Sequence, residues 1–156
     1  MQLLRKSLFL VPLSVALAFV SGCEQQSPMV YVLEGPQDVK LTASASASSV
    51  KTGETVVLHV QRRATGKWKQ IPRDQLTQGQ CWLYTPPPEV EEEVAANVEW
   101  DVYPDGAVEF ERTYRMDHTR IVTAVRKGRI TLRPLSPVRC EKDRVEEGPL
   151  IRIEVG

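Results

Sequence analysis

Hydrophobic and polar residues alternate in short runs along most of the chain after residue 37. In the run 55–61, Val56, Leu58 and Val60 occupy every second position, and His59 lies between them. A period of two residues places neighbouring side chains on opposite faces of a strand, so this run predicts a half-buried strand with His59 outward. The same pattern recurs at 98–102, 108–114, 120–126, 129–135 and 150–155.

Turn-forming residues separate these runs. Pro104-Asp105-Gly106 follows the run 98–102, and proline fixes φ while glycine permits the positive φ that many turns need. About seven short alternating segments divided by such turns predict an antiparallel β-sandwich. Trp100 shares a face with the valines on either side of it, so we expect it to be buried between the sheets. The one helical candidate is 89–97, which follows three prolines.

The first 22 residues have a different character. Arg5 and Lys6 precede an uncharged apolar core at 8–20, which is shorter than the roughly 20 residues that a bilayer-spanning helix needs. The small residues Ser21-Gly22 and then Cys23 end this core. A basic start, a short apolar core and small residues are typical of an export signal.

The tetrapeptide Val20-Ser21-Gly22-Cys23 resembles the lipobox of bacterial lipoproteins. The resemblance implies a signal peptide over 1–22 and Cys23 as the first residue of the mature protein, carrying acyl chains such as palmitate. Stable anchoring takes at least two chains. In enteric-type bacteria an aspartate after the lipidated cysteine favours retention in the inner membrane. The residue here is Glu24, so we expect the outer membrane. The alternative is an ordinary signal peptide with Cys23 merely near the cut.

Loss of residues 1–22 removes Arg5 and Lys6 and moves the formal charge from zero to about −2. There is no basic stripe, so we expect no nucleic-acid partner. The remaining chain of about 134 residues suffices for one domain. We expect a lipidated cysteine and tether over 23–37, where 29–33 could add an edge strand. The β-sandwich domain then covers 38–156, with a loop insertion at about 62–96.

The domain resembles bacterial immunoglobulin-like domains. The segments that carry this resemblance are 41–43, 49–58, 98–100, 128–132 and 150–155. The chain departs from the family in three ways: Ile130 replaces a tyrosine, the inter-sheet cysteine pair is missing, and the insertion is long. A transthyretin-like sandwich, as in the lipoprotein subunit of type VI secretion machines, is the alternative.

Two cysteines, Cys81 and Cys140, remain once Cys23 is lipidated. Two cysteines in an exported protein indicate a disulfide rather than a metal site. The sequence also lacks the CxxC pair that is typical of structural zinc sites. The immunoglobulin-like resemblance implies that their two loops emerge at one end of the domain, with Pro134 and Pro137 ending the strand before Cys140. Two unpaired thiols are the alternative.

Trp82 and Tyr84 lie beside Cys81 and are the candidate binding surface. Aromatic side chains in this insertion could stack on a sugar or on a partner protein. The alternative is that they pack, together with Trp68, into a small core under a long loop. Four acidic residues follow at 89 and 91–93, and we expect them to form a solvated face whose members repel one another.

No motif in the sequence specifies a reaction. Asp117-His118-Thr119 lacks the strained nucleophile turn of a catalytic triad. The acids at 101, 105, 109 and 111 lack the spacing of a calcium loop. We therefore predict no catalytic residue, no metal and no cofactor. The sequence favours a non-enzymatic, lipid-anchored binding or structural module of the cell envelope, with another envelope protein or a polysaccharide as partner. A secretion-machine subunit and a small envelope enzyme are the alternatives.

Overall fold

The computed structural model describes residues 27–112 and 117–156, so the expected signal peptide and Cys23 lie outside the described residues. The described residues form thirteen strands and two short 3-10 helices, which confirms the predicted all-β class. The strands are β1 Met29–Leu33, β2 Asp38–Ala45, β3 Ser49–Val50, β4 Thr55–Thr65, β5 Trp68–Pro72, β6 Trp82–Leu83, β7 Glu91–Glu93, β8 Glu99–Tyr103, β9 Val108–Phe110, β10 Thr119–Ala124, β11 Gly128–Val138, β12 Glu141–Glu147 and β13 Ile151–Val155. The 3-10 helices are η1 Arg73–Gln75 and η2 Ala95–Asn97.

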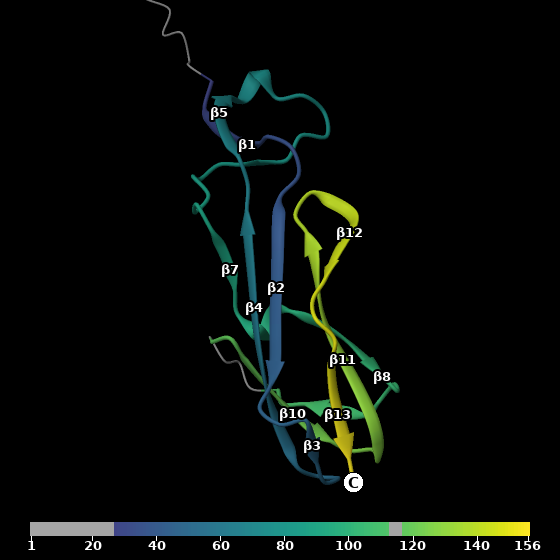
Figure 1. Ribbon diagram of the computed structural model, residues 1–156. Helices are drawn as coiled ribbons and strands as arrows, with labels where there is room; N and C mark the ends of the chain where they lie inside the picture. Colours follow the sequence, from purple (N-terminus) through teal and green to yellow (C-terminus); the bar gives the residue numbers. More distant parts are fainter. Residues whose placement is uncertain (1–26, 113–116) are drawn as a thin grey trace, which may run out of the picture.

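Two five-stranded sheets form a sandwich (Figure 1). The first has the order β2-β4-β10-β9, with β7 paired to the second half of β4. The second has the order β12-β11-β13-β3, with β8 paired to β11. Neighbouring strands are antiparallel except β3 and β13, which are parallel. A third, small sheet of order β5-β1-β6 lies at the end of the molecule opposite the C-terminus.

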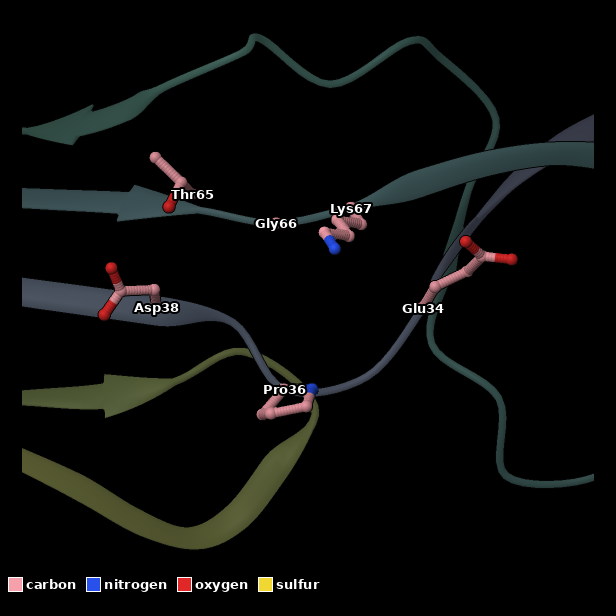
Figure 2. Close-up of a pocket in the computed structure, with 6 residues that line it drawn as sticks. All are labelled: Glu34, Pro36, Asp38, Thr65, Gly66 and Lys67. Atoms are coloured by element: carbon pink, nitrogen blue, oxygen red, sulfur yellow. The ribbon is translucent and has the colours of Figure 1, made fainter.

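Two short connections join the small sheet to the sandwich: residues 34–37 between β1 and β2, and residues 66–67 between β4 and β5 (Figure 2). The backbone N–H of Glu34 donates to the carbonyl of Lys67 at 2.7 Å, which holds the connections together. Gly66 permits this close approach, since a Cβ there would lie 2.7 Å from Cδ1 of Leu33. A hollow of about 360 Å³ opens between the two connections.

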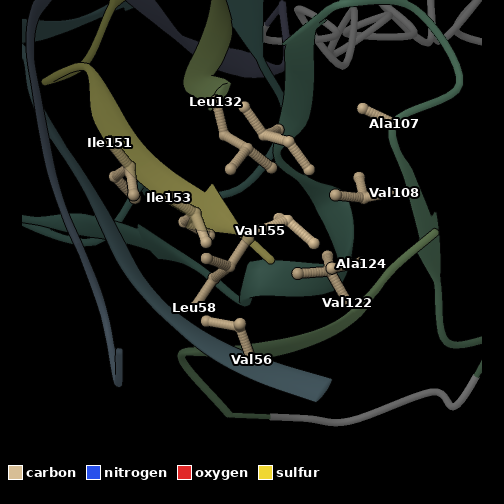
Figure 3. Close-up of a cluster of buried hydrophobic side chains, with 11 residues drawn as sticks. Val56, Leu58, Ala107, Val108, Val122, Ala124, Leu132, Ile151, Ile153 and Val155 are labelled. Atoms are coloured by element: carbon tan, nitrogen blue, oxygen red, sulfur yellow. The ribbon is translucent and has the colours of Figure 1, made fainter. Parts of the chain in front are cut away.

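The main core fills the space between the two large sheets (Figure 3). Val56, Leu58 and Val60 of β4 are buried and His59 is exposed, as the alternation predicts. On the opposite sheet β13 buries Ile151, Ile153 and Val155. Besides Val56, Leu58 and these three residues of β13, the buried members of the main core are Ala107, Val108, Val122, Ala124, Ile130 and Leu132. Removal of these side chains from water is the main favourable term holding the sheets together.

Four strand segments occupy part of the expected loop insertion at 62–96. β4 continues to Thr65 and keeps its alternation, with Arg62 and Ala64 buried. Strands β5 and β6 lie on either side of β1, so 29–33 forms the central strand of the small sheet rather than an edge strand. With a partner on each side, the backbone groups of β1 are hydrogen-bonded in both directions, which a short edge strand would lack.

The predicted helix at 89–97 is wrong. Glu91–Glu93 is strand β7, and only Ala95–Asn97 is helical, as a single 3-10 turn. The glutamates also do not form a repelling solvated face. Glu93 and Glu92 lie opposite Arg62 and Arg63 of β4, with side-chain N···O distances of 3.5 and 3.2 Å. Backbone pairing and opposite charges on β4 outweigh the weak local preference for a short helix.

Pro134 and Pro137 do not end their strand. Both lie inside β11, which continues to Val138 and then turns into β12, a strand that the sequence pattern did not reveal. The pairing with β12 shifts register between Pro137 and Val138, where proline has no N–H to donate. β12 escapes detection because its residues are mostly charged, with Val145 itself exposed.

Trp100 lies on β8 as expected but is half-buried rather than fully buried. Its side chain packs against the main core and against a smaller cluster of Val60, Ala95 and Val98. Its ring lies 6.3 Å from that of Phe110, centroid to centroid. Trp100 therefore bridges two parts of the interior, with one edge at the surface.

Candidate functional site

The small sheet positions the predicted aromatic residues. Trp82 of β6 lies directly opposite Val32 of β1, and the backbone N–H of Leu33 donates to the carbonyl of Cys81 at 3.0 Å. β6 is antiparallel to β1, so Tyr84 lies beyond Leu83 towards the start of β1. Cys81 thus lies at the base of the small sheet, next to the sandwich, and Tyr84 lies towards its tip.

The predicted disulfide between Cys81 and Cys140 is present, with a Cα–Cα distance of 5.7 Å. Cys140 lies in the turn between β11 and β12, with φ at 66°. The bond therefore ties the small sheet to the second sheet of the sandwich, 59 residues further along the chain. A shallow hollow of about 380 Å³ lies beside it, lined in part by Gly35, Gln80 and Arg139.

Trp82 and Tyr84 contact each other edge to face, with ring centroids 4.7 Å apart and ring planes at 89°. The guanidinium carbon of Arg73, in η1, lies 5.8 Å from the Trp82 ring centre and 5.6 Å from that of Tyr84. Edge-to-face pairs and cations over aromatic rings are both favourable arrangements. We call Arg73, Trp82 and Tyr84 the aromatic–arginine cluster.

The cluster has a packed side and an open side. Because Trp82 lies opposite Val32, the two side chains share a face of the sheet with Val30, and both valines are buried. Trp82 is half-buried, whereas Tyr84 is 57% exposed. The small-core interpretation therefore fits Trp82, and Tyr84 remains available at the surface.

Trp68 does not join this cluster. It lies opposite Leu33 of β1, which is the residue after Val32, so it points to the other face of the small sheet. Its indole nitrogen instead lies close to Gly66 at the junction with the sandwich. Of the three aromatic residues singled out in the insertion, the structure brings together two.

Sequence reasoning missed Arg73 and its neighbours at the start of the described chain. The backbone N–H of Arg73 donates to the carbonyl of Pro28 at 2.9 Å, and that of Asp74 donates to Oγ of Ser27 at 3.2 Å. The aromatic–arginine cluster thus lies beside the point where the expected tether enters the fold. No periodic pattern marks Arg73, because η1 is a single turn without buried residues.

A polar network locks the small sheet's connection to the sandwich. Gln37 is buried in the connection between β1 and β2. Its side-chain Nε2 donates to Glu91 at 3.2 Å, and its backbone carbonyl accepts from Arg144 at 3.4 Å. Glu91 also pairs with Arg139 at 3.4 Å. The side-chain hydrogen bond to Glu146 raises the pKa of Arg144, so this guanidinium is charged at any working pH.

A second buried polar contact lies between the two large sheets. Nε of Arg62 donates to Oγ of Ser136 at 2.5 Å and lies 3.5 Å from Glu93. Arg62 is buried and Glu93 is about half-exposed, so the guanidinium is sealed inside while its carboxylate partner reaches solvent. A buried charge needs such partners.

His59, Asp117 and His118 are exposed side chains. His59 and His118 share the wall of an open hollow of about 380 Å³, and Nε2 of His118 lies 4.0 Å from Glu92. Asp117 accepts from the N–H and hydroxyl of Thr119, which makes it the polar turn expected there. Among residues 27–112 and 117–156, no group of three or more histidine, cysteine, aspartate or glutamate side chains could hold a metal ion.

Within the described part of the chain, none of the helices has the length and apolar character needed to cross a bilayer. The immunoglobulin-like topology implied by the sequence stays a prediction. No protein-family model, curated protein or solved structure matches the chain.

Proposed function

We propose that this protein is a bacterial lipoprotein, anchored through Cys23, that acts as a non-catalytic binding or structural module of the cell envelope. The lipobox resemblance at 20–23 supports the anchor, and Glu24 favours the outer membrane. The Cys81–Cys140 bond supports an oxidising compartment outside the cytoplasm.

The observation that carries the proposal is the aromatic–arginine cluster on a sheet stapled by a disulfide. The staple and the Gln37 network hold the small sheet in place, so Tyr84 is presented on a rigid support. Rigid aromatic side chains beside an arginine are the residue types that dominate binding surfaces. A fixed surface also loses little conformational freedom when it binds.

The anchor is tested by growing cells with labelled palmitate. The wild-type protein should take up label and fractionate with membranes, whereas Cys23→Ala should remain unprocessed or become free of the membrane. Cys81→Ala, which removes a cysteine of the folded part, is the matched control and should still be labelled. Undiminished labelling of Cys23→Ala would refute the proposed lipoprotein.

A further inference from the structure

The aromatic–arginine cluster lies at the tip of the small sheet, where the tether enters. Ser27 and Pro28 are hydrogen-bonded to the backbone of η1, and the guanidinium of Arg73, in the same turn, lies 5.6 Å from the Tyr84 ring. These contacts fix the position of the tip relative to residue 27. An anchor that keeps residue 27 close to a membrane surface therefore also keeps Tyr84 close to that surface.

The reach of the tether is short. Ser27 is four positions after Cys23, and a fully extended chain spans at most about 3.6 Å per residue, so the two residues lie about 14 Å apart at most. The headgroup layer on each side of a bilayer is about 5–8 Å deep. An anchor at Cys23 would therefore keep the tip of the small sheet within roughly two to three headgroup-layer depths of the membrane.

The tip has the chemistry of a membrane interface. Tyr84 is 57% exposed, although most of its large side chain is an aromatic ring. Met29, the first residue of β1, is 44% exposed, and strand alternation places it on the other face of the small sheet. Tyrosine and tryptophan concentrate where headgroups meet acyl chains, since their rings are apolar and their polar groups stay hydrated. Arg73 adds a cation, since its guanidinium lies over both rings and carries a charge that attracts lipid phosphates.

From this arrangement we infer that the aromatic–arginine cluster, Arg73, Trp82 and Tyr84, rests on the lipid headgroups of the membrane that holds the anchor. The inference rests on the proposed lipid anchor and names the partner of that same surface. The sandwich then projects away from the bilayer, with the small sheet as its base. Lipid, rather than an envelope protein or a polysaccharide, covers Tyr84.

A photo-cross-linking amino acid at two exposed tyrosines tests this orientation in intact cells. Tyr84→benzoylphenylalanine probes the tip. Tyr103→benzoylphenylalanine is the matched control, because Tyr103 is 73% exposed but lies opposite Thr131 of β11. Val138, at the stapled end, is seven positions after Thr131 along β11, or about 23 Å of strand. After illumination, mass spectrometry of the full-length lipidated protein identifies what each position has captured.

We expect phospholipid adducts at position 84 that are several-fold more abundant than at position 103. A protein or polysaccharide adduct as the main product at 84, or equal lipid capture at both positions, would overturn the inference. The mass of the Cys23 peptide from the same sample separates this from a failed anchor. Lipidated Cys23 with no lipid at 84 refutes the orientation alone, whereas unlipidated Cys23 refutes the proposed function and the orientation with it.

Tryptophan quenching gives a second measurement with no cross-linker. Trp68→Phe with Trp100→Phe leaves Trp82 as the single tryptophan, and Trp68→Phe with Trp82→Phe leaves Trp100. Both lipidated proteins are placed in phosphatidylethanolamine–phosphatidylglycerol vesicles whose acyl chains are brominated close to the headgroup. Bromine should quench Trp82 several-fold more strongly than Trp100. Equal quenching of the two would contradict a membrane-facing small sheet.

Discussion

Removing the disulfide between Cys81 and Cys140 should destabilise the protein strongly. The bond closes a loop with a sequence separation of 59 residues, and the chain-entropy model assigns such a loop about 4 kcal/mol at 25 °C. The folded state should survive, because the ion pair of Arg139 with Glu91 and the hydrogen bonds of Gln37 still hold the small sheet's connections. The loss therefore arises mainly in the unfolded chain, which gains freedom when the bond is absent.

The left-handed backbone conformation of Cys140 can be tested separately from the disulfide. Its φ of 66° lies in the left-handed region, which costs a residue with a Cβ about 1 kcal/mol and costs glycine nothing. Cys81→Ala combined with Cys140→Gly should therefore be about 1 kcal/mol more stable than Cys81→Ala combined with Cys140→Ala. Both should remain well below the wild-type protein in stability.

Urea unfolding followed by tryptophan fluorescence measures both effects. With a typical slope of about 2 kcal/mol per molar urea, a loss of 4 kcal/mol lowers the midpoint by roughly 2 M. Treatment of the wild-type protein with a reductant should reproduce the shift. A midpoint within experimental error of the wild type would refute the entropic argument. Equal stability of the glycine and alanine variants would refute the left-handed turn at Cys140.

Three further changes test the interior by thermal or urea unfolding. Trp100→Ala should lower the free energy of unfolding by about 3 kcal/mol, because the side chain packs against two core clusters. Trp100→Phe should retain most of that stability. An unchanged melting temperature in the alanine variant would contradict the packing. Gly148→Ala should cost about 1–3 kcal/mol, because the new Cβ would lie 2.5 Å from Cγ of Pro134 and 3.1 Å from Cβ of Leu41. Gly156→Ala, where nothing lies within 4 Å, is its control, and equal stability of the two would rule out the clash. Ser136→Ala should cost about 1–3 kcal/mol, because buried Arg62 loses its closest acceptor. The double mutant Ser136→Ala with Arg62→Met should recover much of that loss, since no buried charge then lacks a partner. A further fall in stability would argue against the unpaired Arg62 charge as the cause.

The sequence by itself determined the all-β class and most of the core. A strand with one buried face must repeat its apolar residues every second position, so Val56, Leu58 and Val60 could be assigned to the interior from their spacing alone. The last strand, with Ile151, Ile153 and Val155, followed from the same rule. The cysteine pair was predictable because the sequence predicts export and lipidation of Cys23, which leaves two cysteines with few alternatives to a disulfide.

The tertiary structure alone decided which strands pair. Glu91–Glu93 looks like a helix or a charged surface until Arg62 and Arg63 of β4 are placed opposite it. Likewise, β12 has no apolar alternation and forms because β11 offers it a partner beyond Pro134. Hydrogen-bond partners and opposite charges that come from distant segments leave no local periodic signal, so the sequence pattern could not contain them.

The candidate site shows the same division. Trp82 and Tyr84 could be singled out from their position beside Cys81, but Arg73 could not, because a single turn of 3-10 helix has no pattern. Only the folded small sheet places Arg73 over both rings and sets its turn, η1, beside Ser27, the first described residue. Antiparallel pairing of β1 with β5 and β6 produces this meeting, because it brings the end of β5 and the end of β6 to the start of β1.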